Sequence, residues 1–489
     1  LYYNAAYVNK RVNSFANYRA PYWRDTDYGL LTPPGQTYLG YGPTFQGELS
    51  DYNATVGFKS TKNGWNSDLS FTTGGNKQMY TVTNTVNHGI MNSRAEAIAW
   101  NKAHQAQIDS GLVMPREVLA KTPTTFHPGG VRFRQDVGNL DISKILTEKV
   151  SIATGAEFRS ETFEVIAGDE ASYILGGADS YAGNDKVNSF TSSRHNIGGY
   201  FDLALDLTPN FLINGTVRAE NYSDFGNTLI GKFSTRYKFL SDKITLRGSV
   251  SSGFRAPSLH QIYTQKSQYS FGNGTIEVQG LLNNVSPEAQ ALGVPKLKPE
   301  KSTNITLGLG LRPSANFSVT LDYYNITVKD RVVLSNTIGH TTAGNTELDN
   351  ILNASNIVSL SFFANALDTR TSGIDLVTSY RNVQLGTGRM AFNLSGNYTL
   401  ENKRIGAVKN PAVIEAVGQT VVNATQDALM FTSRPQFKAI LGIDYEIGKF
   451  AFNLNNTVFG PTKFRNADLD KNLGIEFLTK LVTDIAIYY

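Results

Sequence analysis

The chain has 489 residues, of which 40% are hydrophobic and 18% are charged, and its formal net charge is +4. No run of about eighteen apolar residues occurs, so helical membrane spans are excluded, and the 45 basic and 41 acidic residues form no basic stripe, so nucleic-acid binding gets no support. The absence of cysteine is compatible with an exported protein that folds without disulfides.

Segments with strict alternation of apolar and polar residues recur along most of the chain. In chain order they include 211–220, 244–251, 305–311, 317–324, 392–398 and 450–454. In the second of these, Leu246 and Val250 share one parity and Arg247 has the other, which places them on opposite faces of a strand. Strands of about ten residues with this alternation, joined by short turns and long polar loops in turn, are typical of outer-membrane barrels. The predicted fold class is therefore all-β, a transmembrane antiparallel β-barrel.

The connections between these segments alternate in length, as a barrel with short periplasmic turns and long outer loops requires. Short turns are predicted at 61–64, 143–148, 208–210, 241–243, 312–316, 386–389 and 446–449. Long outer loops are predicted near 11–50, 88–129, 166–194, 254–302, 329–369, 402–435 and 461–477, with one short outer connection at 222–228. This division gives roughly sixteen strands, and 95–107 is the one stretch with a helical pattern.

Several strings in the second half of the chain carry a family resemblance. The most specific is the string Gly253, Phe254, Arg255, Ala256, Pro257 and Ser258, preceded by 211–225 and 245–250. Further agreeing strings are 297–303, 322–324 and 369–375. In order and spacing over roughly 130–460, the chain resembles the barrel of TonB-dependent outer-membrane receptors.

The resemblance implies an architecture larger than this chain. Family barrels have about 22 strands, of which roughly sixteen or more are represented here, and a plug domain and an energy-coupling box precede the barrel. Neither the plug nor the box is visible in this sequence. We therefore expect residues 1–489 to be an outer-membrane barrel domain that is incomplete at both ends.

The resemblance also implies a function. Family members sit in the bacterial outer membrane and import a scarce nutrient, such as a ferric siderophore, another metal chelate, cobalamin or an oligosaccharide, with energy from the TonB-ExbB-ExbD complex acting through the missing N-terminal region. No enzymatic activity, cofactor or metal is expected. Some relatives act within larger assemblies, so a surface lipoprotein or such an assembly stays open as a partner.

The string 253–258 has a simple physical interpretation. Pro257 lacks an N–H donor and ends a strand ladder, and Gly253 suits the exit of a strand. The string is therefore predicted to be a structural junction into an outer loop. As an alternative, Arg255 faces the lumen and contacts the plug or the cargo.

Aromatic and basic residues in the predicted outer loops are candidates for a cup that binds an organic ligand. These candidates are Trp23, Arg24, Tyr28, Tyr41, Trp100, His127, Arg255, Tyr269 and Phe271. The six histidines lack the spacing of metal ligands, and the acidic group Asp169, Glu170, Asp179 and Asp185 lacks the pattern of a calcium loop.

Three other functions compete with nutrient import. A passive porin predicts that no plug exists in the whole protein, and a β-rich binding protein predicts solubility without detergent. An outer-membrane hydrolase requires a nucleophile and its base near the rim, and the sequence shows no such constellation.

Overall fold

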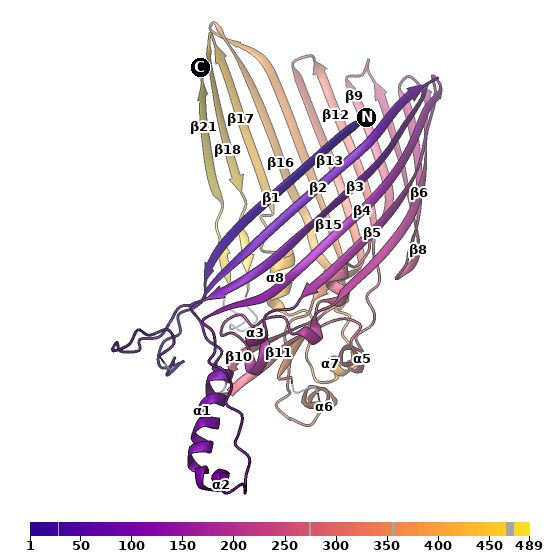
Figure 1. Cartoon of the computed structure of the whole chain (residues 1–489). Coiled ribbons are helices and arrows are strands. Elements are labelled where there is room, and N and C mark those ends of the chain that lie inside the picture. The colour runs from indigo at the N-terminus through magenta and orange to yellow at the C-terminus, as the bar shows by residue number, and fades with distance from the viewer. Residues whose placement is uncertain (28, 273–274, 355–356, 466–473) are drawn as a thin grey trace.

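A single curved wall of sixteen antiparallel strands, each paired with the next along the chain, dominates the structure (Figure 1). The structure is a computed structural model that describes residues 1–27, 29–272, 275–354, 357–465 and 474–489, and describes no side chains over 267–278. The wall strands are β1 (Tyr2–Phe15), β2 (Thr44–Lys62), β3 (Trp65–Thr83), β4 (Thr125–Thr147), β5 (Val150–Ile166), β6 (Thr191–Thr208), β7 (Phe211–Tyr222), β8 (Gly226–Phe239), β9 (Ile244–Arg255), β12 (Glu300–Ser314), β13 (Phe317–Leu334), β15 (Ser359–Leu385), β16 (Gly388–Ile405), β17 (Phe437–Ile447), β18 (Phe450–Phe459) and β21 (Lys480–Tyr488). The predicted fold class and the count of roughly sixteen strands are confirmed.

The predicted strand lengths were wrong. The wall strands contain from 9 to 27 residues rather than about ten, because many continue as paired ribbons past the thickness that a membrane needs. The first outer loop is therefore 16–43 rather than 11–50, and β4 runs on to Thr147, which moves the turn predicted at 143–148 to residues 148–149. The turn at Asn63 and Gly64 was predicted correctly, and both residues have the positive φ of a tight hairpin.

The helices all lie in the outer connections, and most were missed. They are α1 (His88–Ala103), α2 (Gln105–Asp109), α3 (Glu170–Tyr173), α4 (Leu259–Tyr263), α5 (Pro287–Ala291), α6 (Glu347–Ala354), α7 (Ala412–Ala416) and α8 (Ala424–Phe431). The predicted helix at 95–107 corresponds to α1 and α2, but α1 starts earlier because the Asn87 side chain caps it by accepting from the Ile90 N–H. The other six contain four to eight residues, too few for helical periodicity to show. In the part of the chain that the structure describes, no helix has both the length and the apolar character needed to cross a membrane.

The two faces of the wall differ in chemistry. On one face Leu246, Leu309, Leu321 and Leu376 stand directly opposite one another across β9, β12, β13 and β15. Leu246 and Leu321 are 47% and 41% exposed, as expected for residues that meet lipid. We refer to this face as the apolar face and to the opposite face as the polar face.

On the polar face an ion pair spans three strands. Arg247 in β9 donates from Nε to Asp322 Oδ1 in β13 at 2.9 Å, although β12 lies between them. Gly308 of β12 makes this possible, because a Cβ there would lie 2.2 Å from Asp322 Oδ1 and 2.4 Å from Arg247 Nε. The missing side chain of Gly308 thus lets two charges neutralise each other inside the wall.

The wall has two edges. Among the described residues, β1 pairs only with β2, β21 pairs only with β18, and no ladder joins β1 to β21. Side chains on these strands are correspondingly open, with Tyr7 69% and Ile485 72% exposed.

The long connections at one end of the wall share a hydrophobic core of their own (Figure 1). We call it the loop core: its buried side chains come from 282–294, 338–367 and 414–422. Leu348 and Leu352 of α6 and Ile414 of α7 have no exposed surface. Strands β10 (Lys266–Gly272), β11 (Thr275–Leu282) and β14 (Ile338–Gly339) extend the sheet into this region by pairing with one another or with the start of β15, whereas β19 (Thr462–Phe464) and β20 (Ile475–Phe477) form a separate pair.

Substitution Leu352→Ala tests whether the loop core is a folded unit. We expect it to destabilise the loop core by about 3 kcal/mol, because it removes fully buried methyl groups and leaves a cavity. Hydrogen exchange should then speed up over 338–367 and leave β6–β9 unchanged. Leu429→Ala, at a leucine that is 52% exposed on α8, is the matched control and should change exchange little; equal effects of the two variants would contradict a packed loop core.

Candidate functional site

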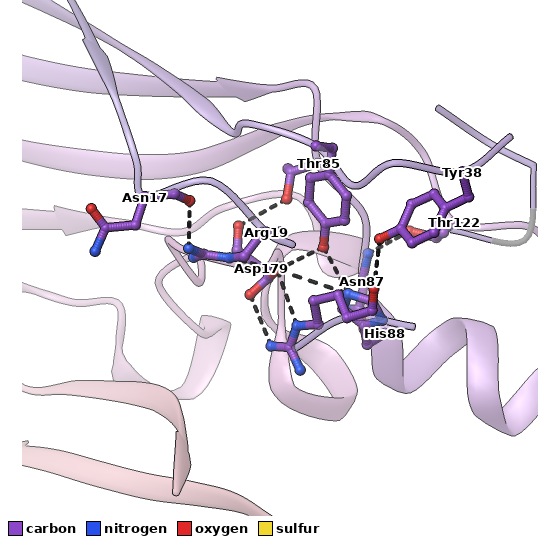
Figure 2. A network of polar contacts seen from close by, with 10 residues as sticks. Asn17, Arg19, Tyr38, Thr85, Asn87, His88, Thr122 and Asp179 are labelled. Atoms are coloured by element: carbon purple, nitrogen blue, oxygen red, sulfur yellow. Dashed lines mark hydrogen bonds and ion pairs between the residues drawn. The ribbon is translucent and has the colours of Figure 1, made fainter. Parts of the chain in front are cut away.

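A buried carboxylate joins separate outer connections at the mouth of the wall (Figure 2). Asp179, in the connection 167–190, accepts hydrogen bonds from Arg19 Nε at 3.0 Å, Arg24 Nη2 at 3.0 Å and the Tyr41 hydroxyl at 2.6 Å. Arg19, Arg24 and Tyr41 all lie in the connection 16–43. The Asp179 and Arg19 side chains are each only 7% exposed, so both charges are desolvated and depend on each other.

His88, the first residue of α1, adds a third connection to this group. Its Nε2 lies 2.7 Å from the Tyr41 hydroxyl oxygen. Since that hydroxyl gives its hydrogen to Asp179, the His88 Nε2–H is left as the donor to the oxygen. Thr85 strengthens the junction by donating to the Asp179 backbone carbonyl at 2.9 Å. We call Arg19, Arg24, Tyr41, His88 and Asp179 the Asp179 cluster.

Burial and charge shift the pKa values in the Asp179 cluster. Burial alone would raise the pKa of Asp179, but the hydrogen bond and charge of Arg24 hold it below the usual range. Burial, together with the positive charge of Arg24, lowers the pKa of His88 to about 4. His88 is therefore neutral at physiological pH, and the cluster holds one carboxylate between two guanidinium groups.

Three of the predicted ligand residues meet at the Asp179 cluster. Trp23 is half-buried, with the Arg19 guanidinium 4.4 Å and the Arg24 guanidinium 5.8 Å from its ring centroid. Tyr41 is 3% exposed, and the Arg24 guanidinium is bonded to Asp179. The polar atoms of Arg24 and Tyr41 are thus used to tie the loops together.

Two other predicted residues lie apart from this cluster. Trp100 is twelve residues along from His88, about 18 Å at the rise of an α-helix, on an arm that projects away from the wall (Figure 1). Its ring stacks on His104 at 4.1 Å and lies 4.7 Å from the Arg116 guanidinium. His127 is exposed at the outer end of β4, with its Nδ1 3.4 Å from the Thr81 hydroxyl.

The string 253–258 lies where β9 leaves the wall. β9 ends at Arg255, whose guanidinium binds both carboxylate oxygens of Glu300 on β12. The buried Arg194 donates from Nη1 to the Pro257 carbonyl at 2.6 Å, and the Ser258 side chain caps α4. The guanidinium of Arg255 is therefore held by Glu300 at the point where the strand ends.

Helix α4 then packs onto the polar face at its outer end. Leu259 is 2% exposed and packs in one cluster with Phe163 of β5. The neighbouring His260 ring lies 5.7 Å from Phe163, and Tyr263 lies 5.9 Å from Phe190. A packed aromatic cluster therefore lies at the outer end of the wall, and the sequence did not predict it because it depends on how α4 returns to the wall.

The remaining predicted residues are only partly described. Tyr28 lies outside the described residues, and Tyr269 and Phe271 have a described backbone in β10 but no described side chain. The first residue of β10, Lys266, places Nζ 3.7 Å from the centroid of the Tyr181 ring, and burial lowers the pKa of Lys266 to about 8. This contact fixes β10 to the connection that carries Asp179.

Sequence reasoning missed the central member of the cluster. Asp179 was noted only as one of several loop acids, and Arg19 was not singled out. The two residues are 160 positions apart in the chain, so no local sequence pattern joins them. The available hint was that one predicted loop has Arg, Trp and Tyr close together and another has several acids. In the described residues, no group of His, Cys, Asp and Glu has the arrangement of a metal site.

A family model described as TonB dependent receptor-like, beta-barrel, matches residues 2–489. Comparison with curated protein sequences finds no match.

Solved structures share the fold at low sequence identity. The siderophore receptor PirA from Acinetobacter baumannii is 14% identical with a TM-score of 0.54, covering 91% of this chain and 56% of its own. A mutant of the ferric enterobactin receptor PfeA from Pseudomonas aeruginosa is 13% identical with a TM-score of 0.59, covering 99% and 62%. The FrpB iron transporter from Neisseria meningitidis is 10% identical with a TM-score of 0.52, covering 99% and 63%. The chain thus spans less than two thirds of the length of these structures.

Substitution Asp179→Asn should release the outer connections. Removing the charge leaves Arg19 and Arg24 buried without compensation, which costs on the order of 3 kcal/mol locally. We expect faster hydrogen exchange over 16–43 and 167–190 in the detergent-solubilised protein, with the wall strands unaffected. Glu170→Gln, at an exposed position of the same connection, is the matched control; exchange that is unchanged in Asp179→Asn would show that the cluster does not hold the loops.

Acidification should loosen the same connections through His88. Its folded pKa of about 4 lies below the ordinary 6.5, so the stability it contributes is complete above pH 6.5 and is lost as the pH falls toward 4, by at most about 3 kcal/mol. Asp179 adds to this loss only below the ordinary aspartate pKa of 3.8, and its contribution is gone once the pH has fallen through its own depressed pKa. Exchange over 16–43, corrected for the intrinsic rate, should rise between pH 7 and 4.5, and His88→Gln should remove most of that rise. A rise of the same size in the variant would exclude His88 as its source.

Proposed function

Because the chain belongs to the TonB-dependent receptor family, as a β-barrel domain of the bacterial outer membrane, we propose that the whole protein carries out energy-coupled import of a scarce nutrient. The observation that carries the proposal is the family match over residues 2–489. Two of the similar structures are siderophore receptors and one is an iron transporter. Ferric siderophores and other metal chelates are therefore the first cargo class to test, ahead of cobalamin and oligosaccharides.

The free edges of the wall support a larger barrel in the whole protein. An unpaired N–H or C=O group costs several kcal/mol in hydrocarbon, so strands that span a membrane close into barrels. β1 and β21 each have one edge without a partner among the described residues. We propose that further strands of the same polypeptide pair with these edges to complete a barrel of about 22 strands, and that a plug domain fills its lumen.

The structured mouth supports capture of cargo before import. The Asp179 cluster and the loop core hold the outer connections in fixed positions, and this preorganisation reduces the entropy that a ligand must spend on ordering its site. Tight capture makes inward release slow, because high affinity mostly results from a low dissociation rate. An external energy source, which we propose to be TonB-ExbB-ExbD acting on the plug, resolves that conflict.

Uptake by cells that carry the full-length protein tests the proposal. We expect accumulation of ⁵⁵Fe from ferric siderophores to fall by about tenfold or more when the gene is deleted, or when a protonophore collapses the proton gradient, because active uptake against tight binding needs that gradient. Surface binding at low temperature should remain in protonophore-treated cells.

Two results would contradict energy-coupled import. Uptake that depends on the gene but is insensitive to the protonophore would favour a passive porin, and the full-length protein should then conduct as an open pore in planar bilayers. Uptake that is unaffected by deletion for every ferric siderophore would remove this cargo class, and cobalamin and oligosaccharides would be tested in the same way.

A further inference from the structure

A polar cavity of about 570 Å³ lies at the outer end of the wall, where β15 and β16 meet the end of α8 and β19. Asn397, which lines the cavity, lies on the polar face. Its Nδ2 donates to Asp375 Oδ1 at 2.7 Å, and Asp375 stands opposite Asp322. The cavity therefore opens on the polar face of the wall, away from the face that meets lipid. Its size is that of a site for a small organic molecule.

Three cations line this cavity: Arg331, Arg434 and Lys463. Within the described residues, no Asp or Glu lines it and none of the three side chains forms an ion pair. Arg331 Nη1 makes a long hydrogen bond to the Thr369 hydroxyl at 3.5 Å, which does not neutralise its charge. The cavity therefore concentrates positive charge that no acid among the described residues pairs with.

The nearby acids are already engaged elsewhere. Glu401 binds Lys403 at 2.8 Å, and Asp427 binds Arg404 at 3.4 Å. Asp375 accepts from Asn397, as described above. These carboxylates therefore do not neutralise the cations that line the cavity.

The walls of the cavity are fixed by hydrogen bonds. Asn402 Nδ2 donates to the carbonyls of Met430 at 3.1 Å and Phe431 at 3.3 Å. The Thr432 hydroxyl donates to the Lys463 carbonyl at 2.7 Å, and the Lys463 N–H donates back to the Thr432 carbonyl at 2.9 Å. The cations thus stand on a braced frame, and the Met430 and Phe431 side chains add apolar surface beside them.

We propose that this cavity binds a small organic anion with several oxygen acceptors and an apolar or aromatic body. Two guanidinium groups and an ammonium group match carboxylate, phosphate or phenolate oxygens, because charge-assisted hydrogen bonds to such groups are the strongest that a protein side chain makes. The position on the polar face favours a solute over a lipid phosphate. The inference rests on the proposed function in one respect: the anion would be, or would be part of, the imported cargo.

Titration calorimetry on the full-length protein in a non-ionic detergent tests this inference without the energy-coupling complex. The probe is trimesate, a benzene ring with three carboxylates, and its uncharged triamide is the matched probe. We expect trimesate to bind and the triamide not to bind. The double substitution Arg434→Gln and Lys463→Gln should weaken trimesate binding by about tenfold or more, since truncating one partner of a charge pair has effects of this size.

The control is a double substitution that removes the same charge outside the cavity. Lys403→Gln with Arg404→Gln removes two cations of the same strand end that are paired with Glu401 and Asp427. It should change the affinity for trimesate less than about twofold, because salt screens the interaction of exposed charges with a ligand at a distance. Arg434 and Lys463 are exposed, so the test variant should keep the gel mobility of a folded barrel before and after heating.

Two outcomes would overturn the inference: no trimesate binding by the unaltered protein, or equal weakening by the test and control variants. Binding is measured on purified protein, whereas energy-coupled import is measured in cells. If the protein binds trimesate but uptake is insensitive to the protonophore, the anion site is supported and the proposed function is contradicted. If uptake is energy-dependent but the protein binds no trimesate, the proposed function is supported and the anion site is contradicted.

Discussion

Each wall strand between the two edges satisfies its backbone hydrogen bonds through its two neighbours, and the rest of the structure depends on this constraint. The ladders fix which residues stand opposite one another, so Leu246, Leu309 and Leu321 form one row and Arg247 and Asp322 project from the other face. A shift of one residue in any strand would exchange the two faces. Gly308 shows that the register matters in detail, since the ion pair passes over β12 at a position that has no side chain to block it.

The outer connections are stabilised in a different way. They gain little from backbone ladders, so they rely on a hydrophobic core of their own and on buried charge. The loop core gathers side chains from three separate stretches, and the Asp179 cluster gathers the connections 16–43 and 167–190 and the start of α1. The Asp179 carboxylate specifies the arrangement more than it stabilises it, because its attraction to the arginines mainly repays the loss of their hydration.

The polar face and the mouth together define where a ligand can be held. Most charges on that face are neutralised by neighbours, as in the pairs of Arg255 with Glu300 and Arg247 with Asp322. The cavity with Arg331, Arg434 and Lys463 departs from this pattern. Three cations without a paired acid among the described residues, gathered in one braced cavity, give the polar face an electrostatic asymmetry suited to recognition.

The sequence by itself determined the wall. Alternation with a period of two is a local property, so the strand at 244–251, its lipid-facing leucines and the Asn63-Gly64 turn could be read from neighbouring residues, and the resemblance of the string 253–258 indicated the family. Only the tertiary structure decided the mouth. It placed Arg24 and Tyr41 in a contact that ties two loops together, joined Arg255 to Glu300, and brought Arg331 into one cavity with Arg434 and Lys463. These contacts join residues far apart in the chain, and their partners are fixed by packing and by the need to compensate buried charge, neither of which leaves a periodic trace in the sequence.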